Sequence, residues 1–403
     1  MNTSHAIGLH PFCFSALTCL LAAAALASGA PAARAADDPS ADHHAKRAFV
    51  YIGPYTNGTS RGIYLFRLDR ASGKLEAAGV TPSDNPSYVA TDPAQRLLFA
   101  VGEMDRFKGQ KAGSVSAFSR DPATGALSPL NQQSSGGEAP CHLVVDHTGK
   151  NLIVANYTGG SVEVLPIEAD GRLGRPSDFV QHRGADANPA RQKKAHAHGV
   201  AMSPDNRFAL VADLGLDRVF VYRFDAEHGK ISPNDPPWLA AAAGAGPRHL
   251  AFHPNGKFVY AINELNSTIA LMSYDAAHGR LESRQTISTL PADAKLPKTG
   301  TSCAELVVHP SGRFLYGSNR GHDSLAMFSI DQQTGRLTPI GYQSSGGHTP
   351  RGFDIDPSGD WLIAANQDSA NVVVFRIDRQ TGRLIPTGIT VEVDKPVCVK
   401  ILE

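Results

Sequence analysis

The sequence has 403 residues, with 38 Lys and Arg against 38 Asp and Glu, and 19% of its residues are charged. A formally neutral chain carries no electrostatic footprint for nucleic acid or for an anionic membrane surface, so we expect neither as a partner. Its 38 Gly and 27 Pro residues exceed average usage but stay below the fraction typical of disorder, which indicates a turn-rich globular protein.

Residues 1–35 resemble a signal peptide. An apolar run from Phe12 to Ala27 is followed by Ala33-Arg34-Ala35, the small-residue pattern that a signal peptidase cleaves. We predict cleavage after Ala35 and a periplasmic or secreted mature protein. A membrane anchor is the alternative, but this run is shorter than the roughly 20 residues that a spanning helix needs. A polar leader over 36–47 then precedes a single domain over 48–403, and its His43-His44 pair is expected to be solvated.

Three cysteines remain after the predicted cleavage: Cys141, Cys303 and Cys398. An odd number in an exported protein leaves at least one thiol unpaired, and we expect all three to be small buried residues. The sequence contains no C-x-x-C or H-E-x-x-H motif. It therefore gives no support for zinc or haem chemistry, and we expect no metal and no cofactor.

One phrase recurs along the mature chain roughly every 52 residues. An alternating run, a D/H-P-x-G-type turn and a second apolar run predict a β-hairpin, whose strands we call A and B. Strand A is expected to start at Pro86, Pro140, Ala197, Pro247, Cys303, Pro350 and Pro396.

A second hairpin, strands C and D, follows each of these units, and its turn contains a glycine. The glycines are Gly73, Gly125, Gly171, Gly229, Gly279, Gly335 and Gly382. The seventh strand A, at Pro396, has nothing after it, whereas the first B, C and D strands, from Ala48, have no strand A before them. We therefore predict an all-β, seven-bladed β-propeller of four-stranded antiparallel blades, closed by pairing of the C-terminal strand with the N-terminal strands.

The meander within each blade brings the starts of A strands and the ends of B strands to the axis on one face. This face also carries the long loops, where function is usually located. We name as catalytic candidates His142, His198, Glu264, Arg248 and Arg320, and as substrate-binding candidates Arg351, Glu305, Glu103, Asn156, His249 and Asp213. Guanidinium groups suit an anionic ligand, and His or Glu can act as general base or acid.

Several phrases occur in a fixed order that generic propeller turns do not explain. They include YIGPYTNGTSRGIYLFRLD, GGEAPCHLVVD, AHAHGVAMSPD, GAGPRHLAFHPNGKFVYAINEL, SNRGHDS and TPRGFDIDPSGDWLIAANQ. Across essentially the whole mature chain they resemble the bacterial lactonase family of the propeller-type 6-phosphogluconolactonases, to which fungal carboxy-cis,cis-muconate cyclase is related. The resemblance implies metal-independent action in an axial cleft on an acidic sugar or related lactone. Its motifs point to His142, His198, Arg248, Glu264, Glu305, Arg320 and Arg351.

The leading hypothesis is hydrolysis of a sugar-type lactone, with Glu264, His142 or His198 as general base and Arg248 or Arg320 stabilising the oxyanion. Arg351 would hold a remote anionic group. A cycloisomerase acting on an unsaturated polycarboxylate is the second hypothesis, and an exported carbohydrate- or protein-binding propeller without catalysis is the third. The expected partner is a small anionic or sugar-derived lactone, and we expect a monomer. Whether the natural substrate is phosphorylated stays open at this point.

Overall fold

The structure is a computed structural model that describes residues 47–185, 188 and 190–403. The predicted signal peptide, the leader up to residue 46 and the His43-His44 pair lie outside these residues. Every regular element in the described part is a β-strand, and none of it forms a helix long and apolar enough to cross a membrane.

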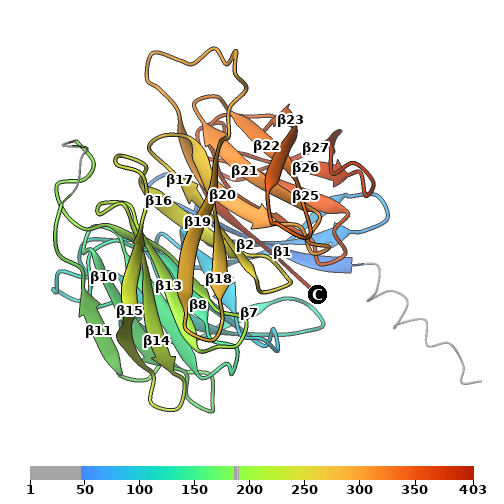
Figure 1. Ribbon diagram of the computed structural model, residues 1–403. Coiled ribbons are helices and arrows are strands. Elements are labelled where there is room, and N and C mark those ends of the chain that lie inside the picture. The colour runs from blue at the N-terminus through green and yellow to red at the C-terminus, as the bar shows by residue number, and fades with distance from the viewer. Residues whose placement is uncertain (1–46, 186–187, 189) are drawn as a thin grey trace, which may run out of the picture.

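The described strands form seven four-stranded sheets, each an antiparallel meander, as predicted (Figure 1). From strand A to strand D, the closing blade is β28 (Pro396–Leu402), β1 (Arg47–Pro54), β2 (Gly62–Asp69) and β3 (Leu75–Pro82). The next is β4 (Val89–Thr91), β5 (Leu97–Gly102), β6 (Ser114–Arg120) and β7 (Leu127–Ser134), followed by β8 (Pro140–Val145), β9 (Asn151–Asn156), β10 (Ser161–Pro166) and β11 (Asp178–Gln181). Then come β12 (Ala197–Met202), β13 (Phe208–Asp213), β14 (Arg218–Asp225) and β15 (Lys230–Ala240), and β16 (Pro247–Phe252), β17 (Phe258–Asn263), β18 (Thr268–Asp275) and β19 (Arg280–Ser288). The last two are β20 (Ser302–Val308), β21 (Phe314–Arg320), β22 (Ser324–Ile330) and β23 (Leu337–Ser344), and β24 (Pro350–Ile355), β25 (Trp361–Asn366), β26 (Asn371–Ile377) and β27 (Leu384–Glu392).

The A strands of neighbouring blades contact one another in a closed ring, so they line the axis. The blue first strand and the red last strand run side by side in Figure 1, and β1 pairs with β28 from Phe49↔Leu402 to Pro54↔Pro396. The predicted closure is therefore confirmed. It leaves no open sheet edge between the first and last blades.

The apolar core lies between the blades rather than within one sheet. One cluster packs Ile153 and Val164 of one blade against Val211 and Phe220 of the next, and the other inter-blade contacts repeat this arrangement. Each blade must bury both faces in this way, which explains why the same apolar pattern recurs in every repeat. Cys141, Cys303 and Cys398 are buried free thiols, as expected.

The repeated turn glycines have a geometric cause. Gly279, for example, has φ 65°, and a Cβ there would lie 2.4 Å from the Phe208 ring of the neighbouring blade. Glycine tolerates this left-handed conformation without a steric penalty.

The connections between blades differ in length. After the short outer strand β11, a long connection from His182 leads into β12. A second long connection, from β19 to β20, projects at the top of Figure 1.

Candidate active site

At the ends of three B strands, two adjacent residues have different partners, because side chains alternate between the two faces of a strand. In Asn156-Tyr157, Asn263-Glu264 and Asn319-Arg320, the second side chain enters a polar cluster near the axis. The first binds the loop that leads into its blade from the preceding one: Asn156 Nδ2 donates to the Ser135 carbonyl (2.7 Å), and Asn319 Nδ2 donates to the Thr289 carbonyl (2.8 Å). Successive strand side chains point to opposite faces, so only one of each pair can reach the axis.

The A strands contribute through a β-bulge near their start. In β8, β12, β16 and β24 the pairing register shifts at the second residue of the strand. The residues released from the ladder are Cys141, His198, Arg248 and Arg351. Bulges commonly re-aim side chains beside active sites, and here they direct these four groups toward the axis.

Glu264 is the centre of the cluster. Its carboxylate binds three guanidinium groups: Arg248 Nε (3.0 Å), Arg320 Nη2 (3.0 Å) and Arg191 Nη2 (2.7 Å). His198 Nε2 lies 4.0 Å from the same carboxylate. Burial by itself would raise the pKa of Glu264, but the three arginines outweigh burial and lower that pKa to about 2. Glu264 is therefore ionised throughout the physiological range.

Four aromatic rings form a layer beneath this cluster. The His142 ring lies 4.0 Å from that of Tyr88 and 4.8 Å from that of His249, and the His198 ring lies 5.2 Å from that of His249. Burial, followed by nearby positive groups, holds the pKa values of all three histidines well below the usual range. The histidines are therefore neutral near pH 7, and neutral imidazoles can accept a proton.

Glu305 supports this layer from behind. Its carboxylate accepts from His249 Nδ1 (2.8 Å) and from the Leu306 amide (2.9 Å). Arg248 Nη1 donates to the Ala304 carbonyl at 2.7 Å and lies 3.1 and 3.4 Å from the two His249 ring nitrogens. Nearly equal distances to both nitrogens place the guanidinium over the ring face. His249 and Glu305 thus form the platform on which Arg248 rests.

The axial channel continues behind the ring layer as a cavity of about 270 Å³. Its inner end is lined by Tyr88, His142, His249 and Glu305, and its outer part by residues that include Asp354 and Lys400. Lys400 Nζ and Asp354 Oδ2 are 3.4 Å apart. This cavity lies toward the ends of the A strands and so on the opposite side of the ring layer from Glu264.

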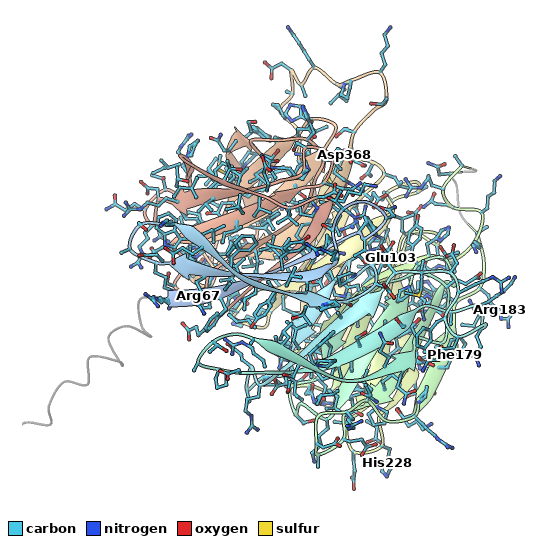
Figure 2. All side chains as sticks on the ribbon, turned by 180° about the vertical axis from the view of Figure 1, so that it is seen from behind. Arg67, Glu103, Phe179, Arg183, His228 and Asp368 are labelled. Atoms are coloured by element: carbon cyan, nitrogen blue, oxygen red, sulfur yellow. The ribbon has the colours of Figure 1, made fainter. Side chains whose placement is uncertain are left out.

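A second polar cluster lies where the chain closes. Arg351 Nη2 donates to the Tyr55 hydroxyl (2.9 Å), and this hydroxyl donates to the Glu103 carboxylate (3.0 Å). The Ser87 hydroxyl also donates to Glu103. Figure 2 shows Glu103 near the middle of the molecule, whereas His228 lies at its outer edge. Arg351 also interacts electrostatically with Glu264, so the two clusters belong to one site.

Asn156 and Asp213, which we expected to bind substrate, lie at the same end of the blades but bind the chain itself. Asp213 accepts from His182 Nδ1 (2.6 Å) and from the His196 and Gly215 amides. Both residues occupy the first position of the residue pair at the end of a B strand, and side chains at this position bind the loop that leads into the blade. The remaining expected residues, His142, His198, Glu264, Arg248, Arg320, Arg351, Glu305, Glu103 and His249, are brought to the axial region.

The sequence interpretation missed two members of the site. Tyr55 directly follows the B strand of the closing blade, as Tyr157 and Glu264 directly follow theirs. The position of Tyr55 in the repeat could therefore have identified it. Arg191 comes from the long loop between β11 and β12, where it binds Glu264 and the Tyr157 hydroxyl (3.0 Å). A loop outside the repeat has no register, so no pattern could place Arg191.

The described residues contain no group of three or more His, Cys, Asp or Glu side chains arranged to hold a metal ion. Acid–base and guanidinium groups are what this site offers. A neutral imidazole beside a cluster of guanidinium groups can activate water and stabilise a developing oxyanion.

Comparison with known proteins agrees with the observed fold. The family described as "Lactonase, 7-bladed beta-propeller" matches residues 49–401. A 6-phosphogluconolactonase of Bacillus subtilis is 36% identical over 87% of this chain and 97% of its own length. A 6-phosphogluconolactonase of Formosa agariphila is 33% identical over 76% of this chain and 86% of its own.

A solved structure shows the same architecture. The periplasmic gluconolactonase of Pseudomonas aeruginosa superimposes with a TM-score of 0.83 and 34% sequence identity. The alignment covers 89% of this chain and 99% of the Pseudomonas chain.

Proposed function

We propose, because this chain belongs to the lactonase family of seven-bladed β-propellers, that it hydrolyses a sugar-type lactone to the corresponding aldonic acid. The relatives named above are a 6-phosphogluconolactonase and a gluconolactonase, so both kinds of sugar lactone are precedents. The observation that carries the proposal is the placing of a neutral imidazole, His198, next to the guanidinium groups around Glu264.

His198 is the general base that this arrangement favours. Glu264 is a poor candidate, because its carboxylate is already bound by three guanidinium groups that lower its pKa to about 2. His142 lies deeper, in the ring layer, and its Nδ1 accepts from the Val200 amide (3.3 Å). His198 Nδ1 faces the Cys141 thiol at 3.6 Å, while Nε2 faces the carboxylate cluster.

In this mechanism His198 takes a proton from water as the water oxygen attacks the lactone carbonyl. Arg248 and Arg320 stabilise the negative charge on the carbonyl oxygen. The bond to the ring oxygen then breaks, and the imidazolium returns its proton to that oxygen, which leaves as the product hydroxyl. Glu264 holds the arginines in place, and Arg351 binds an anionic part of the substrate. A general base contributes roughly 10²–10⁴-fold and an oxyanion donor about 10²–10³-fold.

Export belongs to the proposal as well. The apolar run and the Ala33-Arg34-Ala35 site support a periplasmic or secreted enzyme, and the Pseudomonas relative is periplasmic by its description. An exported lactonase would meet lactones outside the cytoplasm.

The test is acid release by the purified mature protein from a panel of plain and phosphorylated sugar lactones. We expect hydrolysis above the spontaneous rate, and a loss of at least about 10²-fold in Glu264→Gln and in Arg248→Ala. Unchanged rates in both variants would overturn the assignment of the site. Loss of diene absorbance from an unsaturated polycarboxylate would favour a cycloisomerase, and thermal stabilisation by a lactone that is not consumed would favour a binding protein.

A further inference from the structure

Arg351 differs from the other arginines of the site in its partners. Arg191, Arg248 and Arg320 each form an ion pair with Glu264. Among the described residues no carboxylate lies within 4.0 Å of the Arg351 guanidinium; its hydrogen bond goes to the Tyr55 hydroxyl, and it lies 5.5 Å from the centre of that ring. Glu103 and Glu264 act on Arg351 only from a distance, and a largely buried cation with no carboxylate in direct contact calls for an explanation.

Tyr55 separates Arg351 from the nearest available carboxylate. Burial raises the pKa of Tyr55, so its hydroxyl keeps its proton. An arginine can only donate, and the hydroxyl therefore accepts from Arg351 and donates its single proton to Glu103. The phenol thus links two opposite charges without allowing them to touch.

The backbone around Tyr55 fixes this spacer. The Tyr55 amide donates to the Lys395 carbonyl (3.0 Å), and the neighbouring Thr56 amide donates to Asn85 Oδ1 (2.8 Å). Arg351 comes from β24, Tyr55 follows β1 and Glu103 follows β5, so the link spans three consecutive blades across the closure. A side chain held by two blades cannot easily withdraw from between the two charges.

Building on the lactonase function proposed above, we infer that Tyr55 is a specificity-determining positioning residue. It prevents Glu103 from neutralising Arg351, so that the guanidinium remains available for an anionic group of the substrate remote from the lactone ring. The substrate class is then a sugar lactone that carries a carboxylate or phosphate substituent. Guanidinium binds both groups through charge-assisted hydrogen bonds.

The experiment compares three lactones: glucono-δ-lactone, its 6-phosphate, and glucaro-lactone, which carries a carboxylate. Tyr55→Phe keeps the ring but removes the hydroxyl that lies between the two charges and binds both, so the Glu103 carboxylate can move closer to the Arg351 guanidinium. We expect KM to rise about tenfold for the charged lactones, with kcat within twofold of native and the plain lactone unaffected. Whichever of the two charged lactones responds more strongly identifies the anionic group.

A second variant distinguishes charge competition from simple damage. Tyr55→Phe combined with Glu103→Gln removes the competing carboxylate, and we expect KM for the charged lactones to return to within about threefold of native. A merely structural role for the hydroxyl would not be rescued by deleting its second partner. The matched control is Tyr260→Phe. It removes another buried hydroxyl, which donates to the Gly335 carbonyl (2.8 Å) in a C–D turn.

Equal effects of Tyr55→Phe on plain and charged lactones, or no rescue by Glu103→Gln, would overturn the inference. Its failure is separable from failure of the proposed function. Should the native protein hydrolyse none of the lactones, calorimetric titration with 6-phosphogluconate, glucarate and gluconate measures the anion subsite directly. Tighter binding of the two ligands with a second anionic group, lost in Tyr55→Phe, is then the expected result, and equal affinities for all three would overturn it.

Discussion

Adjacent residues in this site have different chemistry because of where the strand period places them. Glu264 reaches three guanidinium groups at the axis, whereas the preceding Asn263 donates to Thr268 within its own blade. The same division separates Arg320, which pairs with Glu264, from Asn319, whose amide donates to Ser324 within its own blade. Sequence proximity to a functional residue is therefore no guide to function in a blade, but position within the repeat is.

The first prediction at this scale concerns the acidity of His198. Burial and then Arg248 lower its pKa, and a general base acts in its deprotonated form. Activity should therefore be lost only as the pH falls through a pKa below the ordinary 6.5. His198→Asn should lower kcat/KM by about 10²–10⁴-fold. A pH profile of kcat/KM checks both, and an acid limb centred at or above pH 6.5 in the native enzyme would contradict the assignment.

A second prediction concerns Glu163, which is 4% exposed in β10 and whose Oε2 has no hydrogen-bond partner. The equivalent residues in β14 and β18 are Phe220 and Ala270. Burial raises the pKa of Glu163 to about 8, from 4.5 in a solvated chain. The folded state thus binds a proton that the unfolded state has lost, and the free energy of unfolding should fall as the pH rises from about 4.5 to 8.

Glu163→Gln removes this dependence. The melting temperature of the variant minus that of the native protein should therefore be larger at pH 8.5 than at pH 5. The slope at stake is about 1.4 kcal/mol per pH unit at most. Thermal melts over this pH range provide the measurement, with the exposed Glu227→Gln as control. Parallel pH dependences of Glu163→Gln and native protein would show that the carboxyl is not strained by burial.

The sequence was enough to predict most of the polar residues of the site, since each belongs to a repeat whose register is known. Asn156 and Asp213 were chosen because the repeat shows which end of a strand a residue occupies, but not which partner its side chain takes. Arg191 could not be predicted, because a loop of irregular length has no counterpart in the other blades.

At the scale of elements, two of the four A-strand bulges, in β12 and β24, depend on glycine. A Cβ at Gly199 of β12 would lie 2.4 Å from the Arg248 carbonyl oxygen, and one at Gly352 of β24 would lie 2.4 Å from the Val397 carbonyl oxygen. Each glycine directly follows a bulged residue, His198 or Arg351. The backbone of the next blade can therefore approach the bulge only because these positions lack a side chain.

Gly199→Ala should for this reason move the bulge or its neighbour, and so displace both His198 and Arg248. We expect a destabilisation of about 1–3 kcal/mol, as in overpacked cores, and a disproportionate loss of kcat. Denaturant titration and steady-state kinetics measure the two effects. Gly317→Ala in β21 is the control, because a Cβ there would lie nearest the flexible ends of Ile262 and Ile269 and only in ordinary contact, at 3.8 Å, with a backbone atom, the Glu305 carbonyl oxygen. Equal effects at both glycines would argue against a special role of the bulge.

The strands and turns could be predicted from the sequence where the same residue types recur in each repeat. Turn glycines and alternating apolar runs fixed the hairpins, and most expected A-strand starts agree with the structure within one residue. The bulges have no such signal, because a register shift depends on how two blades meet. The same reason explains β4, which pairs only over Val89–Thr91 although its phrase begins at Pro86.

At the scale of the whole molecule, the polar cluster of Arg351, Tyr55 and Glu103 exists only because the ring is closed. Arg351, Tyr55 and Glu103 come from the last, the closing and the first complete blade, and β28 holds the closing blade together. Closure was predictable because the single strand A at the C-terminus and the B, C and D strands at the N-terminus together complete one four-stranded blade. The juxtaposition of Tyr55 with Arg351 is a consequence of that closure and has no local signal.

Removal of residues 396–403 should therefore abolish folding and not merely activity. The strand buries Val397, Cys398, Val399, Ile401 and Leu402. At about 1.5–3 kcal/mol for each large apolar side chain, the loss is roughly 10 kcal/mol, which matches the entire stability of an ordinary domain. We expect the truncated protein to show no cooperative thermal transition by circular dichroism.

The control is a circular permutant that joins Glu403 to Arg47 and opens the chain near the exposed Leu296. It should melt within a few degrees of the native protein, because the closing strand is then covalently joined to its neighbour. A truncated protein that melts like the native one would mean that six blades are stable without the shared strand.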